Sequence, residues 1–189
     1  AGISSDTLTL TRPGGLTLST ALTAPEHASA AIRPIFDTTE WRNFQTADFM
    51  PLRNKLMTTA AQATGLSRLP AHVNLSRFYL ARGLYPEAKG ILDLVFSELK
   101  PGEEEASSLI LHAVASTLAG RPEIALADLA SPAVTANVDS QLWKALAYAR
   151  QQKWADAREK FKNVDFAITA LPLDLQRIVI AEAFRASLE

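Results

Sequence analysis

The stretch at residues 76–92 reads SRFYLARGLYPEAKGIL, and the fold prediction starts from it. It places Gly83, Tyr85 and Ala88 in a G-x-Y-x-x-A arrangement. Glycine readily adopts the left-handed backbone with which many helices end. Pro86 is tolerated just after the turn, because the first N–H groups of a helix have no intrahelical partner. The stretch therefore predicts two helices joined by a tight turn at Gly83.

The same unit recurs twice along the chain. Ala125 follows Ala88 by 37 residues, and Ala157 follows Ala125 by 32 residues. These spacings average about 34 residues, and self-similarity at such a period is typical of a two-helix repeat. Small side chains let antiparallel helices approach closely, and larger ones fill the space beside them. The small residues twelve positions before each alanine are Ser76, Ala113 and Ala145. The larger neighbours are Tyr79, Tyr148, Leu92, Leu129 and Phe161.

These residues resemble the tetratricopeptide repeat family over about residues 69–171. The resemblance implies an all-α fold, a right-handed α-α superhelix of about three tetratricopeptide-like helix pairs with flanking helices. The sequence departs from the family pattern at three positions. Ser116 stands where a large residue is preferred, Pro122 where an aromatic is preferred, and Gln152 where the turn glycine is expected. The alternative is an ordinary helical bundle whose alanines coincide with the pattern.

The repeats assign residues 37–189 to one helical repeat domain. Asp37 and Glu40 have the spacing of a capping box, which predicts a helix start. A helix predicted over 52–64 would cover the otherwise exposed end of the first repeat. The predicted repeats span about 69–101, 106–137 and 138–171, and Pro172 opens a closing helix at 172–188.

Residues 1–36 differ in kind from the rest of the chain. Threonine and leucine alternate at 7–11, leucine alternates with threonine and serine at 16–19, and a Pro-Gly-Gly sequence lies between them at 13–15. Period-two alternation around such a turn predicts a small N-terminal β-hairpin. An extended segment rich in threonine and serine is the alternative.

Composition argues against several classes of function. The 189 residues carry 19 Lys and Arg against 20 Asp and Glu, so no basic excess favours nucleic acid or an anionic membrane surface. No apolar run approaches the length of a membrane span. The absence of cysteine removes disulfides and thiolate sites, and it leaves the compartment open. The start at Ala1 and the end within a helical pattern favour a domain excised from a larger, bacterial-style protein.

The sequence contains no recognisable catalytic or cofactor motif. His27, His72 and His112 have no second histidine or cysteine at ligand spacing, so no zinc site is predicted. There is no nucleophile elbow, phosphate-binding glycine loop or His-Glu-x-x-His. We therefore expect no cofactor, no metal and no catalytic residue, and we expect His112 to be a packing or groove residue.

In the resembled family, the first helix of each repeat lines a concave groove that holds a partner. The predicted groove is mainly apolar, which disfavours the family's carboxylate clamp. It suits an amphipathic helix, a strand or the chain's own N-terminal segment. Arg77 and Trp143 are predicted to be its more exposed members, and burial of Ile110 and Val114 between repeats is the alternative. The predicted groove residues are Val73, Asn74, Arg77, Ile110, Val114, Thr117, Leu142, Trp143, Leu146 and Arg150.

Together these patterns predict a non-catalytic protein–protein interaction scaffold of the tetratricopeptide-like kind. Its partner is a protein or peptide of unknown identity, or another part of its own parent chain. One alternative is a structural spacer whose groove is filled by its own N-terminal segment. Another is an accessory domain of an enzyme, for which a deep polar pocket with a perturbed carboxylate or histidine would be the sign.

Overall fold

The computed structural model describes residues 2–4, 7–9, 35–100, 104–135, 137–162 and 164–189. Backbone contacts divide the protein into two units, 1–33 and 34–189, and each is described by itself. In the first unit, β1 (Gly2–Ser4) pairs antiparallel with β2 (Thr7–Thr9), and Ile3 lies opposite Leu8 in the register. The turn predicted at 13–15 and the strand predicted at 16–19 lie outside the described residues.

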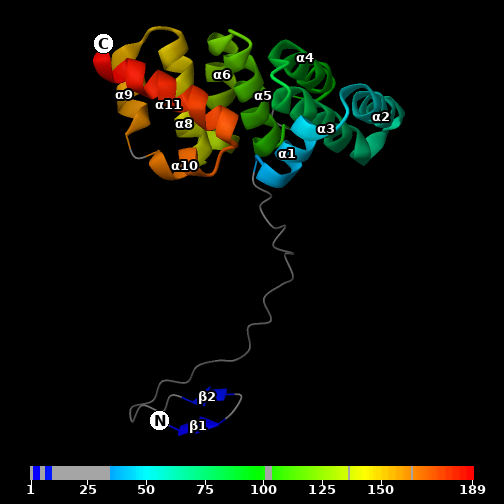
Figure 1. The fold of residues 1–189 in the computed structure, drawn as a ribbon, viewed down its shortest axis with the longest axis horizontal. Coiled ribbons are helices and arrows are strands. Elements are labelled where there is room, and N and C mark those ends of the chain that lie inside the picture. The colour runs from blue at the N-terminus through cyan, green and yellow to red at the C-terminus, as the bar shows by residue number, and fades with distance from the viewer. Residues whose placement is uncertain (1, 5–6, 10–34, 101–103, 136, 163) are drawn as a thin grey trace. The chain divides into compact units, whose positions relative to one another are not determined.

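The second unit is built of helices, which confirms the all-α prediction for this part of the chain (Figure 1). Its body consists of three helix pairs. They are α3 (Arg68–Ala81) with α4 (Tyr85–Phe96), α5 (Ala106–Leu118) with α6 (Pro122–Leu129), and α8 (Val138–Arg150) with α9 (Trp154–Phe161). The elements around them are α1 (Thr38–Thr46), α2 (Phe49–Gln62), the 3₁₀ helix η1 (Gly65–Ser67), α7 (Pro132–Thr135), α10 (Asp165–Thr169) and α11 (Leu173–Leu188).

The turn inside each pair has the same backbone geometry. Gly83, Gly120 and Gln152 have positive φ angles of 73°, 76° and 59°. In each turn the next N–H bonds back to the carbonyl five residues earlier, which is the Schellman motif of a helix end. These bonds are Leu84 N to Tyr79 O at 2.9 Å, Arg121 N to Ser116 O at 2.8 Å and Lys153 N to Tyr148 O at 3.0 Å. The turn predicted at Gly83 is thus repeated twice, the last time without a glycine.

The small residues predicted at the contacts between paired helices are buried. The Ser76 hydroxyl donates to the Ala88 carbonyl oxygen at 3.0 Å, which joins α3 to α4. A close approach of this kind needs small side chains on both helices. The fully buried members of the set are Ser76, Ala88, Ala113, Ala125, Ala145 and Ala157. Packed helix pairs are therefore confirmed.

Helix α1 covers the first of these pairs. The Asp37 carboxylate accepts hydrogen bonds from two backbone N–H groups of the first turn, at 2.8 and 3.0 Å, so the predicted cap is present. The helix packs on α3 with Trp41 and Phe44 buried. The Phe44 ring meets the Phe78 ring edge-on, with centroids 5.9 Å apart. The residues before α1 are also part of the core, because Ile35 and Phe36 are buried.

Helix α11 covers the third pair and packs on α8 and α9. Its buried residues are Leu175, Val179, Glu182 and Ala186. The Trp41 indole N–H donates to Asp174 Oδ1 at 3.0 Å, so α1 and the start of α11 meet although 133 residues separate them. The two flanking helices thus come together next to the first helices of the pairs.

Candidate functional site

Most of the predicted groove residues lie inside the core. The prediction that Trp143 is exposed is wrong, because the Phe36 ring packs against it with centroids 5.8 Å apart. Burial is also what the structure shows for Ile110 and Val114. The fully buried members of the predicted set are Ile110, Val114, Thr117, Leu142, Trp143 and Leu146.

The remaining predicted residues lie at the edge of this core. Arg77 Nη1 is 3.9 Å from Glu40 Oε2 on α1. Arg150 Nε is 3.3 Å from Glu182 Oε1 on α11. Both predicted cations are therefore paired with the flanking helices, and the ten residues do not form one open surface. The half-buried members are Val73, Asn74 and Arg77.

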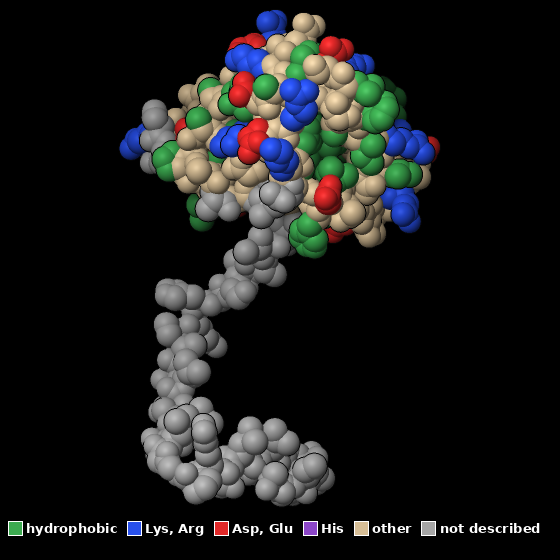
Figure 2. All heavy atoms as spheres, turned by 90° about the vertical axis from the view of Figure 1, so that its left-hand side faces the viewer, with side chains coloured by type: hydrophobic (Ala, Val, Ile, Leu, Met, Phe, Trp, Pro, Cys, Tyr) green, Lys and Arg blue, Asp and Glu red, His purple; other side chains and the backbone are tan. Residues whose placement is uncertain are grey.

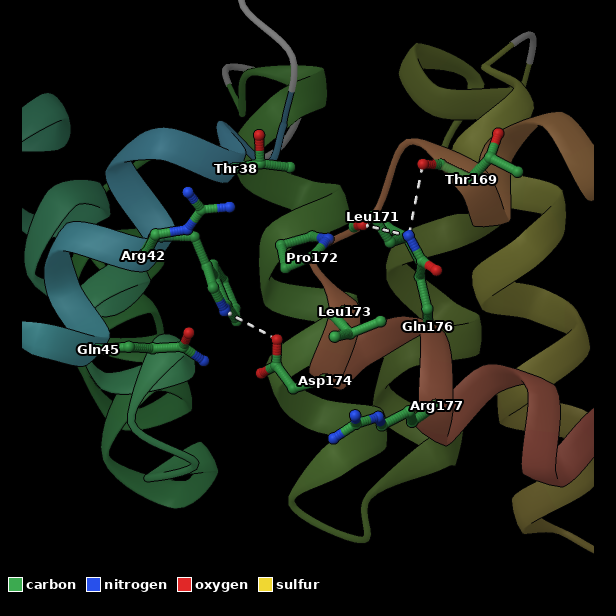
Figure 3. A pocket seen from close by; sticks show the side chains of 11 residues that line it. Thr38, Arg42, Gln45, Thr169, Leu171, Pro172, Leu173, Asp174, Gln176 and Arg177 are labelled. Carbon is green, nitrogen blue, oxygen red and sulfur yellow. Dashed lines mark hydrogen bonds between the residues drawn. The ribbon is translucent and has the colours of Figure 1, made fainter.

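The surface is hollowed where α1 faces α10 and the start of α11 (Figure 3). This pocket has a volume of about 520 Å³. Sequence reasoning selected none of its lining residues. On α1 they are Thr38, Trp41, Arg42 and Gln45. On the opposite wall they are Thr169, Leu171, Pro172, Leu173, Asp174, Gln176 and Arg177.

Two hydrogen bonds fix the walls of the pocket. The bond from Trp41 to Asp174 joins one wall to the other. The Gln176 side-chain amide donates to the Leu171 carbonyl oxygen at 2.8 Å, which holds the segment between α10 and α11 (Figure 3). Both bonds are part-buried, so the geometry of the pocket is set before any partner arrives.

The pocket also contains two arginines that are free to bind. Figure 3 shows Arg42 on α1 and Arg177 on α11 on either side of Asp174. Within the described parts of the chain, neither guanidinium has a hydrogen bond or an ion pair to a protein group. Two arginines against one aspartate leave the lining with a net positive charge. Each guanidinium can donate a forked pair of hydrogen bonds to a carboxylate.

A second polar cluster surrounds His112 and joins three helices. His112 Nδ1 lies 2.7 Å from Asp128 Oδ2 on α6, and His112 Nε2 lies 2.8 Å from Asp93 Oδ1 on α4. Asp93 also accepts hydrogen bonds from Lys89, at 2.8 and 2.6 Å. The Phe96 ring packs edge-on against the imidazole at 5.1 Å. His112 is thus a buried packing residue that ties the first pair to the second.

The charges in this cluster favour the imidazolium form. Burial by itself lowers the pKa of His112, but the hydrogen bonds and charges of Asp128 and Asp93 outweigh it and raise that pKa above its ordinary value. Burial likewise opposes ionisation of Asp93, yet Lys89 and His112 keep its pKa below the usual range. Since both ring nitrogens contact carboxylates, His112 has no free nitrogen with which to bind a metal or act as a base.

Among the residues that the structure describes, no group of His, Cys, Asp and Glu side chains could hold a metal ion. No described helix combines the length and the apolar character that crossing a bilayer requires. Comparison of the chain with family models, curated proteins and solved structures finds no match.

The pocket was missed because its walls come from opposite ends of the helical unit. The capping box at Asp37 and the helix start at Pro172 signal that two flanking helices exist. Neither signal says that the helices meet. An exposed arginine near a helix start is also common on any protein surface, so Arg42 and Arg177 carry no signal of their own.

Proposed function

We propose that this chain is a non-catalytic protein-interaction domain, a tetratricopeptide-like right-handed superhelix of three helix pairs. Support for the repeat comes from the three matching Schellman turns and from the buried small residues at equivalent positions. In this proposal the partner does not bind along the apolar first helices, because α1 lies against α3, α11 lies against α8, and the apolar residues of α5 are buried. It binds at the pocket between those two flanking helices.

The observation that carries the proposal is the pair of unpaired arginines in a fixed pocket. Arg42 and Arg177 belong to different walls, so one ligand can contact both. A volume of about 520 Å³ falls within the usual range of ligand sites. It accommodates a few residues of an extended peptide. The chemistry that fits is an acidic peptide whose side-chain or terminal carboxylates accept from Arg42 and from Arg177, with apolar contact to Leu173.

The test is a titration with a fluorescein-labelled peptide of six residues rich in glutamate, and with its glutamine counterpart. We expect the acidic peptide to bind, the glutamine peptide to bind more weakly, and added salt to weaken the acidic complex. Arg42→Ala and Arg177→Ala should each reduce affinity about tenfold, which corresponds to about 1.4 kcal/mol.

Arg121→Ala is the matched control for this titration. Arg121 is exposed and lies at the turn before α6, away from the pocket lining. Its replacement should leave peptide affinity unchanged. If the three alanine variants lose affinity equally, binding is general attraction to positive charge, and the pocket proposal fails.

A second candidate is the structural spacer, and one observation favours it. The chain's own residues fill the space beside the first helices, because Ile35, Phe36, Trp41 and Phe44 are buried there in the same core as Trp143. On this reading no partner is required. Absence of any acidic-peptide binding, with unchanged stability of Arg42→Ala and Arg177→Ala, would favour the spacer.

A further inference from the structure

Helix α11 has an apolar stripe on its solvent side. The spacing of seven, four and four residues places all four members on one helix face. Figure 2 shows hydrophobic side chains gathered on one side of the face that it turns to the viewer. The stripe consists of Leu173, Ile180, Phe184 and Leu188, each between 53% and 72% exposed. Such large side chains are seldom left together in water without a partner.

Helix α11 continues the stack of helices, but its outer face has no antiparallel partner helix within the described chain. The helix packs on α9 and α8, much as α8 packs on α6 and α5. Its Ala186 shares a small buried cluster with Ala149 and Ala157. The helices α3, α5 and α8 each have an antiparallel partner, namely α4, α6 and α9. Within the described chain no such helix covers the stripe of α11.

We propose that the stripe is the contact surface of a homodimer, in which α11 of a second copy packs antiparallel across a two-fold axis. A two-fold contact brings identical patches together, so the patch must be self-complementary. The stripe is nearly symmetric about Ile180 and Ala181. Leu173 lies seven residues before Ile180 and Leu188 lies eight residues after it. The antiparallel arrangement therefore sets Leu173 against Leu188 of the second copy.

The charged residues beside the stripe favour the same orientation. Arg177 lies three residues before Ile180 and Phe184 lies four after it, so each guanidinium meets a phenyl ring of the other copy. Asp174 and Arg185 lie on the same flank of α11, and flanks of the same side face each other in antiparallel helix pairs. Arg185 Nη1 lies 3.2 Å from Glu182 Oε2 within its own copy, and it can also pair with Asp174 of the second copy, twice by symmetry. A parallel pair would instead set Arg177 against its own copy, which repulsion opposes.

The size of the surface predicts a weak dimer. A helix of 16 residues is about 24 Å long. One helix pair of that length buries less area than the roughly 1,600 Å² of a standard stable interface. We therefore expect dissociation in the micromolar range. Leu173, Asp174 and Arg177 also line the pocket, so a peptide bound there would compete with the dimer for them. Phe184 does not line the pocket, so Phe184→Asp tests the dimer without changing the peptide site.

The first experiment is sedimentation velocity of the full chain from about 1 µM to about 1 mM, a range that brackets micromolar dissociation. The wild type should change from monomer to dimer with concentration. Phe184→Asp should remain monomeric, while Phe166→Asp should dimerise like the wild type. Phe166 is the matched control because it is a phenylalanine on α10 that is 82% exposed and outside the stripe. Circular dichroism and thermal melts verify that both variants fold.

Cysteine cross-linking tests the orientation, because the chain has no cysteine of its own. Ile180→Cys lies beside the proposed axis and should form a disulfide-linked dimer under mild oxidation. Leu173→Cys should not link to itself, because the two copies of residue 173 would be about 22 Å apart. It should link to Leu188→Cys when the two variants are mixed. A monomeric wild type at all concentrations, or self-linking of Leu173→Cys, overturns the proposal.

Discussion

His112 Nδ1 and Asp128 Oδ2 lie 2.7 Å apart, and the imidazole is held from its other side by Asp93. This contact links α5 to α6, while the contact to Asp93 links α5 back to α4. Because the pKa of His112 is raised, the folded protein binds a proton at this residue more tightly than the unfolded chain does. The cluster therefore makes the stability of the helical unit depend on pH.

The sign of this dependence follows from the raised pKa. The stabilisation is fully present below the unfolded histidine pKa of about 6.5, and it is lost as pH rises through the raised folded pKa. Urea unfolding between about pH 5 and pH 9 should show falling stability on the alkaline side. His112→Gln should flatten that slope. His72→Gln is the control, because His72 Nδ1 contacts the Arg68 carbonyl oxygen rather than a carboxylate. An unchanged slope in His112→Gln would contradict the assignment.

Replacing Gln152 with glycine should stabilise the third pair. A non-glycine residue in left-handed backbone lowers the free energy of unfolding by about 1–2 kcal/mol. Glycine avoids this strain, but it loses about 0.5–1 kcal/mol because its unfolded chain has more conformational entropy. We expect a net gain of about 0.5–1 kcal/mol in urea unfolding. Gln151→Gly is the matched control, because Gln151 has a φ of −88° and gains nothing from glycine. A loss of stability in Gln152→Gly would show that its side chain matters more than its backbone.

The same change, glycine to alanine, should have opposite effects at two positions on either side of Ala88. At Gly83, with φ of +73°, alanine should lower the free energy of unfolding by about 1 kcal/mol. At Gly90, inside α4, alanine should raise it by about 0.5–1 kcal/mol. An added Cβ meets no atom within 4 Å at either position, so backbone preference alone decides the sign. Thermal melts that move in the same direction would disprove this account.

Ala88→Leu should overpack the contact between α3 and α4. Ala88 is fully buried, and its carbonyl oxygen accepts the Ser76 hydroxyl at 3.0 Å. Three extra carbons have no space there, so we expect a loss of about 1–3 kcal/mol. Glu87→Leu, at the exposed neighbouring position, should change stability by less than about 0.5 kcal/mol. Equal tolerance at the two sites would contradict the close approach of the pair.

The helix pairs could be predicted from the sequence because their signals are local. Gly83 and Gly120 mark the turns, and the alanines at a period of about 34 residues mark the contacts. The third turn could also be located although Gln152 replaces the glycine, because the other two turns define the position that needs positive φ.

The burial of most predicted groove residues could not be predicted from such local signals. The apolar residues on the first helix of a pair show the same sequence periodicity whether they contact a partner protein or another part of the chain. The burial of Trp143 depends on Phe36, which lies more than a hundred residues earlier in the sequence. The pocket depends on Trp41 and Asp174, which are equally remote from each other. Periodicity carries no information about contacts of this range.

The hydrogen bond from Trp41 to Asp174 also affects how the helical unit unfolds. Stacked repeats contact only their neighbours, so either end can fray without the other. Here a link across 133 residues couples the two ends, and because the loop that it closes is long we expect it to form late in folding. In hydrogen exchange, α1 and the start of α11 should open in one step. The helical unit should then unfold cooperatively rather than as a chain of independent helix pairs.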